Sequence, residues 1–424
     1  MRSVADHLAA VLDAARPVAA LDVVLADAEG CVLAEDVHAP HDVPGFTVAA
    51  CDGYAVHASD VGLRGPGPAS EVTLPVVEDV AVTAPEPLRL VAGAAALVAA
   101  GAPVPAGADA VVPLDRTDRG RARVVIRGGA EPGENLRPAG HDVPVGATVL
   151  TRGTRLAARH LAVAAAVGRG RLAVHPRPRV VVMTVGDELA EPGRAARPGT
   201  RPDANGHALA AAARDAGASA LRVGPVGDER GGLREAIADQ LVRADLLVLT
   251  GGLSPGPWDT VADVLAPLGT VRFDQVAMAP GGRQGFGTVR VLDDATDLLH
   301  PGGLGTGGSG VPLFALPGDP VAALVCYEVF VRPALRAMGG HSDVYRPSLR
   351  AAVARPISSP AGLRQFVPAR LSGSPSEGYV VDPLGGAGDP SLAGLSAANA
   401  LLVVGEDTTR VRAGDTLACL VLDG

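Results

Sequence analysis

The sequence predicts a multidomain protein in which an α/β domain lies between β-rich regions. The chain has 424 residues, too many for one ordinary core, so two to four domains are expected. From residue 179 to about 338, short apolar runs alternate with helical patterns, which is typical of a largely parallel sheet covered by helices on both faces. Residues 61–150 and 345–424 contain short apolar runs separated by turn residues. This pattern indicates β-structure, with a small barrel or sandwich at the C-terminal end.

The elements of the α/β region can be assigned in chain order from their periodicity. Strands have short continuous apolar runs, and helices have apolar residues spaced by three or four. The predicted elements are a strand at 179–184, a helix at 205–217, a strand at 220–224, a helix through Leu233, Ile237 and Leu241, a strand at 246–249, a strand at 314–317 and a helix through Val321, Leu324 and Val325.

The segments around this region are assigned in the same way. Residues 1–17 place Val4, Leu8 and Val11 on one helical face, and they lack the basic start and unbroken apolar core of a signal peptide. Residues 156–167 have the pattern of a buried helix, and the proline-rich 175–179 that of a linker. The glycine-rich stretch 300–312 is expected to be a surface loop.

Composition excludes several classes of function. The net charge of −9 argues against a general nucleic-acid surface, which requires a basic face. The chain contains no lysine. A Schiff-base enzyme and a P-loop nucleoside triphosphatase are excluded, because both require a lysine amine. No stretch approaches the ~20 apolar residues of a membrane span. We therefore expect no membrane partner and a cytoplasmic location.

The stretch LLVLTGGLSPGPWD at 246–259 is the most informative local feature. A buried strand runs into glycines whose backbone can turn sharply and bring N–H groups against a ligand oxygen. In an open α/β sheet, this carboxyl edge is where ligands bind. Ser254 and Asp259 add a hydroxyl and a carboxylate. The alternative is an ordinary strand-to-helix loop in which Asp259 caps the next helix.

Several other carboxylates follow strands or turns. Asp52 lies in a turn beside Gly53, Asp142 follows ENLRPAGH, and Asp187, Glu188 and Asp228 follow predicted strands. Carboxylates that converge at strand ends suit Mg²⁺, which binds one or two carboxylates together with water and phosphate oxygens. A simpler alternative is that Asp228 caps the following helix and that Asp187 and Glu188 interact with a helix dipole. LPGDPVAAL at 316–324 could likewise be a structural turn.

In this order, the motifs resemble those of the molybdopterin molybdenumtransferase family, the bacterial MoeA and gephyrin E-domain lineage. The resemblance spans nearly the whole chain. The matching stretches are DVPGF…DGYAV at 42–56, GAPVPAGADAVV at 101–112, PGENLRPAGHD at 132–142, TVGDEL at 184–189, GGLSPGPWD at 251–259 and LPGDPVAA at 316–323.

The resemblance implies a homodimer with four domains per chain. These are an elongated, discontinuous linker and dimerisation domain (1–52 and 141–176), an inserted β-rich domain (53–140), a molybdopterin-binding three-layer α/β domain (177–340) and a C-terminal β-barrel (341–424). The family reaction inserts molybdate into adenylylated molybdopterin and releases AMP with Mg²⁺. A molybdopterin adenylyltransferase and molybdoenzyme apoproteins are candidate partners.

The resemblance also carries residue roles. It implies Asp52, Asp142, Glu188, Asp228 and Asp259 as catalytic carboxylates, and the last three as Mg²⁺ ligands. It implies that substrate is bound by Gly251, Gly252, Ser254, Gly256, Arg283, Pro317 and Pro320.

The chain departs from the family pattern at charged positions. Gln275 and Ala279 stand where the family usually carries lysines, and Asp319 and Asp389 add carboxylates. Ala100 replaces a usual threonine, and Thr260 a usual aromatic residue. Losing cations at an oxyanion site weakens binding by about 1.5–3 kcal/mol for each charge-assisted contact. Arg272, Arg283 and Arg290 are candidates to compensate, because arginine binds oxyanions well.

Three functions follow. The first is a molybdenum-insertion enzyme. The second is a catalytically impaired homologue that acts as a binding or scaffold protein in cofactor assembly, which the loss of the lysines favours. The third is a nucleotide pyrophosphatase built on the same α/β domain, against which the additional domains at both ends argue.

Overall fold

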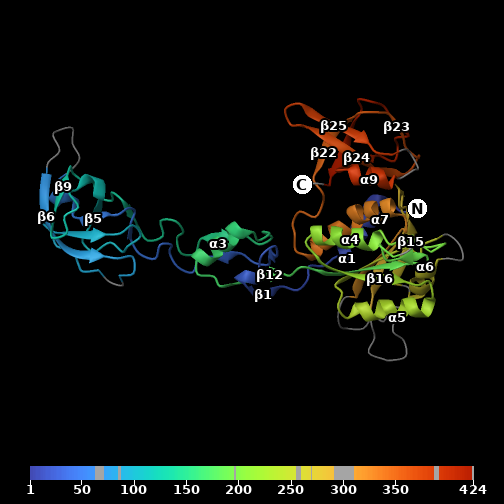
Figure 1. Cartoon of the computed structure of the whole chain (residues 1–424), viewed down its shortest axis with the longest axis horizontal. Coiled ribbons are helices and arrows are strands. Elements are labelled where there is room, and N and C mark those ends of the chain that lie inside the picture. The colour runs from blue at the N-terminus through green and yellow to red at the C-terminus, as the bar shows by residue number, and fades with distance from the viewer. Residues whose placement is uncertain are drawn as a thin grey trace.

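The computed structural model describes residues 1–62, 71–84, 87–194, 197–254, 259–268, 270–290, 310–385 and 391–422. The molecule is elongated (Figure 1). A β-rich body lies at one end, a narrow middle body follows, and an α/β body with a β-barrel above it lies at the other end. Within the described residues, no helix is long and apolar enough to cross a membrane.

The β-rich end body is a five-stranded sheet with the order β8-β5-β7-β6-β9. Tyr54, Val112 and Ile126 are fully buried in its core, because alternate residues of each strand point to the same face. Its elements are β5 (Gly53–Val56), α2 (Ala58–Val61), β6 (Glu71–Val80), β7 (Ala95–Val98), β8 (Ala110–Pro113), η2 (Leu114–Arg116) and β9 (Arg123–Arg127).

The middle body is built from two separate stretches of the chain. Its three-stranded sheet has the order β1-β12-β2, so that a strand near residue 173 joins two strands from the first 40 residues. Its elements are β1 (Leu21–Val24), η1 (Leu25–Asp27), β2 (Val32–Leu33), β3 (Val37–His38) paired with β11 (Thr148–Leu150), α3 (Ala158–Ala166) and β12 (Arg171–His175). The helix predicted at 156–167 is thus present as α3, but the expectation that it is buried is wrong, because Ala164 is the residue of this helix that is buried. Strand β4 (Val48–Ala49) pairs with β10 (Leu136–Arg137), and Ala49 packs into a core of the β-rich end body.

The α/β body contains a six-stranded sheet with the order β16-β13-β17-β21-β20-β18. The first four strands are parallel, as the alternating pattern predicted, and β20 and β18 add an antiparallel edge that the pattern did not indicate. The strands are β13 (Arg179–Val185), β16 (Ser219–Val226), β17 (Leu246–Thr250), β18 (Val271–Gln275), β20 (Arg283–Val289) and β21 (Val311–Leu316). Residues 300–309 of the predicted surface loop lie outside the described residues.

Helices cover both faces of this sheet, which gives the predicted three layers. One face packs against the helices whose residues share a core with Val180, Val248 and Phe314, and the other against the helices that share a core with Val181 and Leu247. The first group is α1 (Val4–Ala14), α4 (Asn205–Asp215), α7 (Pro320–Cys326), the π-helical turn η4 (Tyr327–Val331) and α8 (Arg332–Met338), and the second is α5 (Arg230–Leu241) and α6 (Thr260–Leu265), followed by η3 (Ala266–Leu268). Two short strands, β14 (Leu189–Ala190) and β15 (Arg201–Pro202), pair beside the sheet.

The N-terminal helix is placed differently from the domain boundary that the resemblance implied. That boundary assigned residues 1–52 to the elongated domain. In the structure, Val4 and Val11 of α1 are buried in the core of the α/β body, and Leu8 packs against it. The side chain of Ser3 caps the helix by accepting a hydrogen bond from the backbone N–H of Asp6. Helix α1 therefore belongs to the α/β core, because its apolar face is buried there.

The C-terminal body is a closed β-barrel, as predicted. Strand β24 pairs with β25, β25 with β22, β22 with β28, β28 with β26, and β26 returns to β24, so the ring has no free edge. The elements are β22 (Ser348–Val353), β23 (Ile357–Ser358), β24 (Arg364–Ser374), β25 (Gly378–Pro383), α9 (Leu392–Ala397), β26 (Ala400–Val404), β27 (Arg410–Val411) and β28 (Thr416–Val421). Strand β19 (Met278–Ala279), from the α/β body, pairs with β24.

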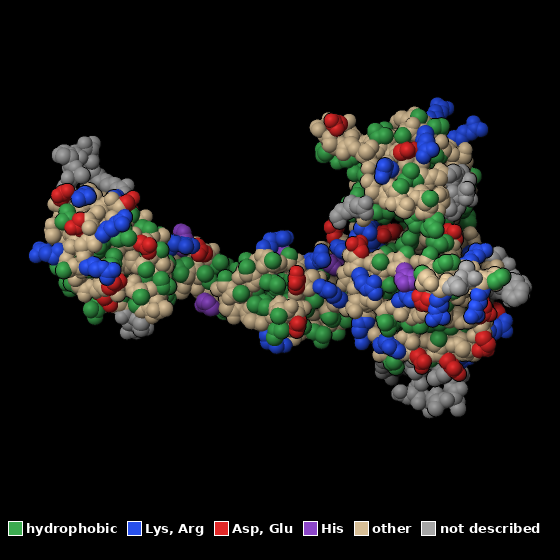
Figure 2. Space-filling view, in the orientation of Figure 1, with side chains coloured by type: hydrophobic (Ala, Val, Ile, Leu, Met, Phe, Trp, Pro, Cys, Tyr) green, Lys and Arg blue, Asp and Glu red, His purple; other side chains and the backbone are tan. Residues whose placement is uncertain are grey.

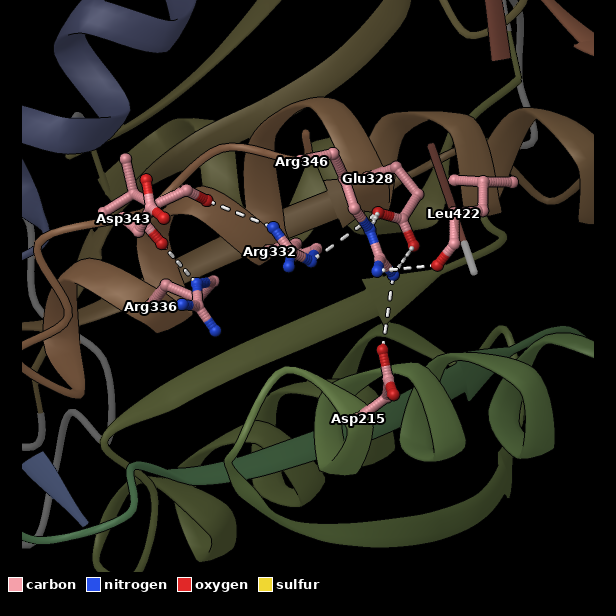
Figure 3. A network of polar contacts seen from close by, with 8 residues as sticks. Asp215, Glu328, Arg332, Arg336, Asp343, Arg346 and Leu422 are labelled. Atoms are coloured by element: carbon pink, nitrogen blue, oxygen red, sulfur yellow. Dashed lines mark hydrogen bonds and ion pairs between the residues drawn. The ribbon is translucent and has the colours of Figure 1, made fainter. Parts of the chain in front are cut away.

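A polar network joins the barrel to the α/β body (Figure 3). Arg346, in the connection between α8 and β22, donates hydrogen bonds to the carboxylate of Glu328 and to the carbonyl oxygen of Leu422 at 2.8 Å each. It also reaches Asp215 at the end of α4, at 3.3 Å. Arg346 therefore connects three segments that are remote in sequence.

Candidate functional site

Three parallel strands of the α/β body end around one cavity. Thr184 of β13 is opposite Thr250 of β17, which is opposite Leu316 of β21, so these strands end at the same edge of the sheet. The segments that follow them enclose a cavity of about 180 Å³. Its polar lining is made by Thr184, Glu188, Arg201, Asp203, Asn205 and Thr250, with Gly251, Gly318 and Pro320 beside them. A cavity therefore lies where the sequence placed ligand binding.

Asn205 holds the ends of two strands together. It is the first residue of α4 and is 8% exposed. Its side-chain amide donates to Thr250 Oγ1 and to the carbonyl oxygen of Gly318, both at 2.9 Å. Thr250 Oγ1 in turn donates to the carbonyl oxygen of Pro317 at 2.7 Å. The loop after β17 and the turn after β21 are therefore fixed relative to each other.

Asp203 stabilises the wall of the cavity through three hydrogen bonds. It is 1% exposed and accepts hydrogen bonds from Thr184 Oγ1 at 3.1 Å, from the backbone N–H of Gly206 at 2.9 Å and from Arg222 at 3.1 Å. The Arg222 guanidinium neutralises the charge of this buried carboxylate, which is costly to bury unpaired. We therefore assign Asp203 a structural role.

Arg222 also forms an ion pair with Glu191, outside the residues that line the cavity. It donates to Glu191 at 2.6 Å, and this hydrogen bond is the main cause that lowers the pKa of Glu191 and raises the pKa of Arg222. Both groups therefore stay charged at neutral pH.

The glycine loop has the backbone that the sequence predicted. Gly251 and Gly252 have φ of +91° and +61°, values that residues with a side chain rarely adopt. A Cβ on Gly251 would overlap the carbonyl oxygen of Val185, and one on Gly252 would lie 2.8 Å from Val261. Ser254 follows in the same loop, half-buried. Gly256 lies outside the described residues.

The turn after β21 faces the same cavity through Gly318 and Pro320. Asp319 caps α7 by accepting from the backbone N–H of Ala322 at 2.8 Å, and Pro320 is the first helical residue. The departure from the family at Asp319 therefore has a structural role as a helix cap. Pro317 lies beside Gly281, at 3.7 Å from the position a Cβ would take there.

The predicted metal ligands Glu188, Asp228 and Asp259 each contact different residues. Asp187 and Asp228 are together, because each carboxylate accepts a hydrogen bond from the backbone N–H of the other, at 3.1 Å. Asp228 does not cap helix α5, because Glu229 does so instead. Glu188 lines the cavity, and a Cβ on Gly186 would overlap its carboxylate.

Asp259 is paired with a cation. It is 7% exposed, and its Oδ2 accepts a hydrogen bond from the guanidinium of Arg283. Although Asp259 stands at the start of α6, its side chain makes no capping hydrogen bond there. Within the part of the chain that the structure describes, its Oδ1 and the Arg283 Nε are enclosed without a hydrogen-bond partner.

Asp52 and Asp142 lie away from the cavity within one chain. Asp52 directly precedes β5 in the distant β-rich body (Figure 1) and accepts from the backbone N–H of Ala100 at 2.7 Å. Asp142, between β10 and β11, is ion-paired with Arg137. The structure of a single chain does not bring these two carboxylates to Glu188, Asp228 and Asp259.

Among the described residues, no group of three or more His, Cys, Asp or Glu side chains is placed to hold a metal ion. The trio Glu188, Asp228 and Asp259 is thus not assembled within one chain. The Asp187 and Asp228 pair leaves one oxygen on each carboxylate without a hydrogen bond in the described structure, which fits a divalent ion that completes its shell with water and phosphate oxygens.

Arg283 is one of the three arginines proposed to replace the lysines, and it contacts the predicted site residue Asp259. Arg272 is 76% exposed and lies 3.9 Å from Asp274. Gln275 is exposed, and its amide lies against Gly282. Asp389 lies outside the described residues. The Arg283 guanidinium is therefore the cation that the structure places beside Asp259.

Comparison with known proteins covers all four bodies. Family models match for the MoeA N-terminal region (domain I and II) at residues 2–168, a probable molybdopterin binding domain at 181–337 and the MoeA C-terminal region (domain IV) at 350–422. Molybdopterin molybdenumtransferase 2 of Mycobacterium tuberculosis is 39% identical over 423 residues, which cover 98% of each chain. The chain belongs to the molybdopterin molybdenumtransferase family.

Other relatives agree with this assignment. Molybdopterin molybdenumtransferase 1 of Mycobacterium tuberculosis is 39% identical over 98% of this chain and 97% of its own. The crystal structure of a molybdopterin biosynthesis MoeA protein from Pyrococcus horikosii superposes with a TM-score of 0.81 at 26% identity, covering 100% of this chain and 99% of that one. The family supports a role in molybdenum cofactor biosynthesis.

The sequence analysis missed the residues that build the cavity wall. Thr184, Asp203, Asn205, Thr250 and Arg222 were not singled out. RPDANGH at 201–207 carries an Asp and an Asn at a helix start, a pattern that occurs at ordinary helix caps. That pattern alone could not show that Asn205 faces a turn 113 residues away.

Proposed function

We propose that this chain inserts molybdate into adenylylated molybdopterin and releases AMP. The observation that supports the proposal best is the cavity at the carboxyl edge of β13, β17 and β21, where Asn205 holds the glycine loop against the turn that contains Gly318. Such an edge is the usual ligand site of an open α/β sheet.

The proposed reaction balances without a redox step. Two Mo–S bonds form to the dithiolene sulfurs, one molybdate oxygen leaves with the two thiol protons as water, and the P–O–P bond is hydrolysed by one water to give AMP. The substrate is anionic at both its phosphates and its molybdate. We propose that the Arg283 guanidinium, held by Asp259, binds one of these oxyanions, because arginine offers several donors in a rigid fork.

The proposal includes Mg²⁺. Asp187 and Asp228 would hold it at their free oxygens, with Glu188 next in the chain. When bound, a divalent ion stabilises charge that develops on phosphate oxygens as the P–O–P bond breaks. The protein's own part is to fix the strand-end loops and to align the substrate in the cavity.

We further propose that the protein acts as a homodimer in the cytoplasm. One chain keeps Asp52 and Asp142 away from the cavity, so a second copy is needed if these carboxylates contribute. Molybdopterin adenylyltransferase and molybdoenzyme apoproteins remain candidate partners for substrate delivery and cofactor transfer.

The test is to incubate the purified protein with adenylylated molybdopterin, molybdate and Mg²⁺, and to follow AMP and cofactor formation. Coupled appearance of both products, dependent on molybdate, is the expected result. Substrate binding without turnover would instead favour the scaffold function that the loss of lysines at 275 and 279 suggests. AMP release that ignores molybdate would indicate a pyrophosphatase.

A further inference from the structure

The hydrogen bonds of Asn205 determine which way its amide faces. The carbonyl oxygens of Gly318 and Pro317 can only accept hydrogen bonds. Thr250 Oγ1 uses its single hydrogen on Pro317, so it must accept from Asn205. Both hydrogens of Asn205 Nδ2 are therefore used, one on Thr250 and one on Gly318. Rotating the amide by 180° would place oxygen against oxygen at Gly318.

The carbonyl of Asn205 is consequently a fixed acceptor. Asn205 lines the cavity, and within the described structure its Oδ1 accepts no hydrogen bond. This atom is also absent from the enclosed polar atoms that lack a partner, so it is open to the cavity. The two hydrogen bonds of Asn205 Nδ2 fix the orientation of its side chain before any ligand binds. The entropic cost of ordering this side chain on binding is therefore lower.

A second acceptor lies on the same wall. The Glu188 carboxylate lines the cavity, and in the described part of the chain it receives no hydrogen bond. Asp203, by contrast, already accepts three hydrogen bonds, from Thr184, Gly206 and Arg222. N–H or O–H donors on a ligand in this cavity would therefore be matched by Asn205 and Glu188.

We propose that Asn205 is a specificity-determining residue that reads the amino-bearing edge of a pterin ring. The naming of the ring rests on the proposed function, whereas the demand for a donor rests on the hydrogen bonds alone. The 2-amino group of an aminopyrimidinone donates to Asn205 Oδ1 in this arrangement, and the adjacent ring N–H donates to the Glu188 carboxylate.

The test compares two fluorescent rings that differ at one group. Pterin carries the 2-amino donor, and lumazine carries a carbonyl oxygen in its place. A site built to accept a hydrogen bond rejects an analogue that presents an acceptor there. We expect the full-length protein to bind pterin at least about tenfold more tightly than lumazine.

Two variants locate the preference. Asn205→Ala should bind both rings with similar affinity, because the acceptor is gone. Thr250→Val removes one anchor but keeps the amide, and should give an intermediate preference. Thermal unfolding of each variant checks folding. Equal affinities for the two rings in the wild-type protein, or a full preference retained by Asn205→Ala, would overturn the proposal.

The turnover assay separates this inference from the proposed function. Molybdate-dependent AMP release without any ring preference would overturn the role of Asn205 and leave the reaction intact. Ring preference lost in Asn205→Ala, in a protein that does not form the cofactor, would support the role of Asn205 and overturn the reaction.

Discussion

Asp259 shows how a neighbouring cation changes what a residue can do. As a free carboxylate it would be a metal ligand, but in the structure its Oδ2 is engaged by Arg283. The pair positions a guanidinium that is 39% exposed on a chain that has no lysine. The ion pair with Asp259 therefore fixes the orientation of the Arg283 side chain.

The role of Arg283 can be tested directly. Arg283→Ala should reduce turnover by about 100-fold, since a lost charge-assisted contact of about 1.5–3 kcal/mol adds to the cost of leaving Asp259 buried and unpaired. Arg283→Lys should keep part of the activity. The matched control is Arg272→Ala, an exposed arginine of the neighbouring strand β18, which should leave turnover unchanged. Equal effects of both alanine variants would remove Arg283 from the site.

Gly251 is constrained both by its φ and by the strand beside it. Gly217, at the end of α4, has a similar φ of +96°, but a Cβ there would meet His341 Nε2 at 3.6 Å, an ordinary contact. We expect Gly217→Ala to lower the free energy of unfolding by about 1 kcal/mol and Gly251→Ala by about 3 kcal/mol or more, because a clash is added to the backbone strain. Urea denaturation followed by circular dichroism measures both. Similar losses would show that the Val185 carbonyl gives way.

Helix α1 buries a histidine together with its apolar face. His7 lies within this helix against Phe330, with ring centroids 4.8 Å apart. In the described structure, its Nε2 is enclosed without a hydrogen-bond partner. Burial, together with the positive charge of Arg2, lowers the pKa of His7 to about 4. Periodicity identified the apolar face of this helix, but the histidine on that face was not singled out.

His7 makes folding depend on pH. Between pH 6.5 and about 4 the unfolded chain binds a proton that the folded protein excludes, so the free energy of unfolding falls as the pH falls through this window. The contribution of His7 amounts to about 3 kcal/mol at most. The free energy of unfolding of the wild type, measured with urea relative to that of His7→Leu, should therefore fall as the pH is lowered from 6.5 toward 4. His141→Leu, at an exposed position between β10 and β11, is the control for removing a histidine. Parallel curves for His7→Leu would contradict the assignment.

The connection between α8 and the barrel depends on Arg346. Its side chain and that of Glu328 are 10% and 11% exposed, whereas Asp215 is 67% exposed. Arg346→Met should lower the free energy of unfolding by about 3–5 kcal/mol, because Glu328 is left buried with Arg332 at 3.9 Å as its remaining ion pair. Asp215→Asn removes an exposed partner and should cost about 0–1 kcal/mol. Urea denaturation measures both free energies of unfolding. An equal loss in the two variants would show that burial does not determine how much each ion pair contributes to stability.

At the scale of the whole molecule, the middle body exposes apolar surface. Figure 2 shows hydrophobic side chains gathered on this body. Leu21 and Val24 of β1 are 52% and 41% exposed, and Val163 of α3 is 36% exposed. Among the residues that the structure describes, strand β1 pairs on one side only, with β12. An apolar surface beside an open strand edge is typical of an interaction site, and it supports the proposed homodimer.

The oligomeric state tests this proposal. A chain of 42.5 kDa should have about twice that mass in solution by light scattering, and Val163→Glu should shift the equilibrium toward the monomer because a charge is buried at the contact. Val242→Glu, at a position 77% exposed in the α/β body, should leave the mass unchanged. A wild-type protein that is monomeric at micromolar concentration would contradict the homodimer.

Apolar periodicity predicted the α/β alternation and the C-terminal β-structure, and motif order predicted the family, because both are local properties of the chain. Which side chains share an environment became visible in the folded molecule alone. Asn205 meets Gly318 across 113 residues, and Asp259 meets Arg283 instead of Glu188. The physical reason is that hydrogen bonding and ion pairing depend on how strands align in the sheet, and no local pattern carries that alignment.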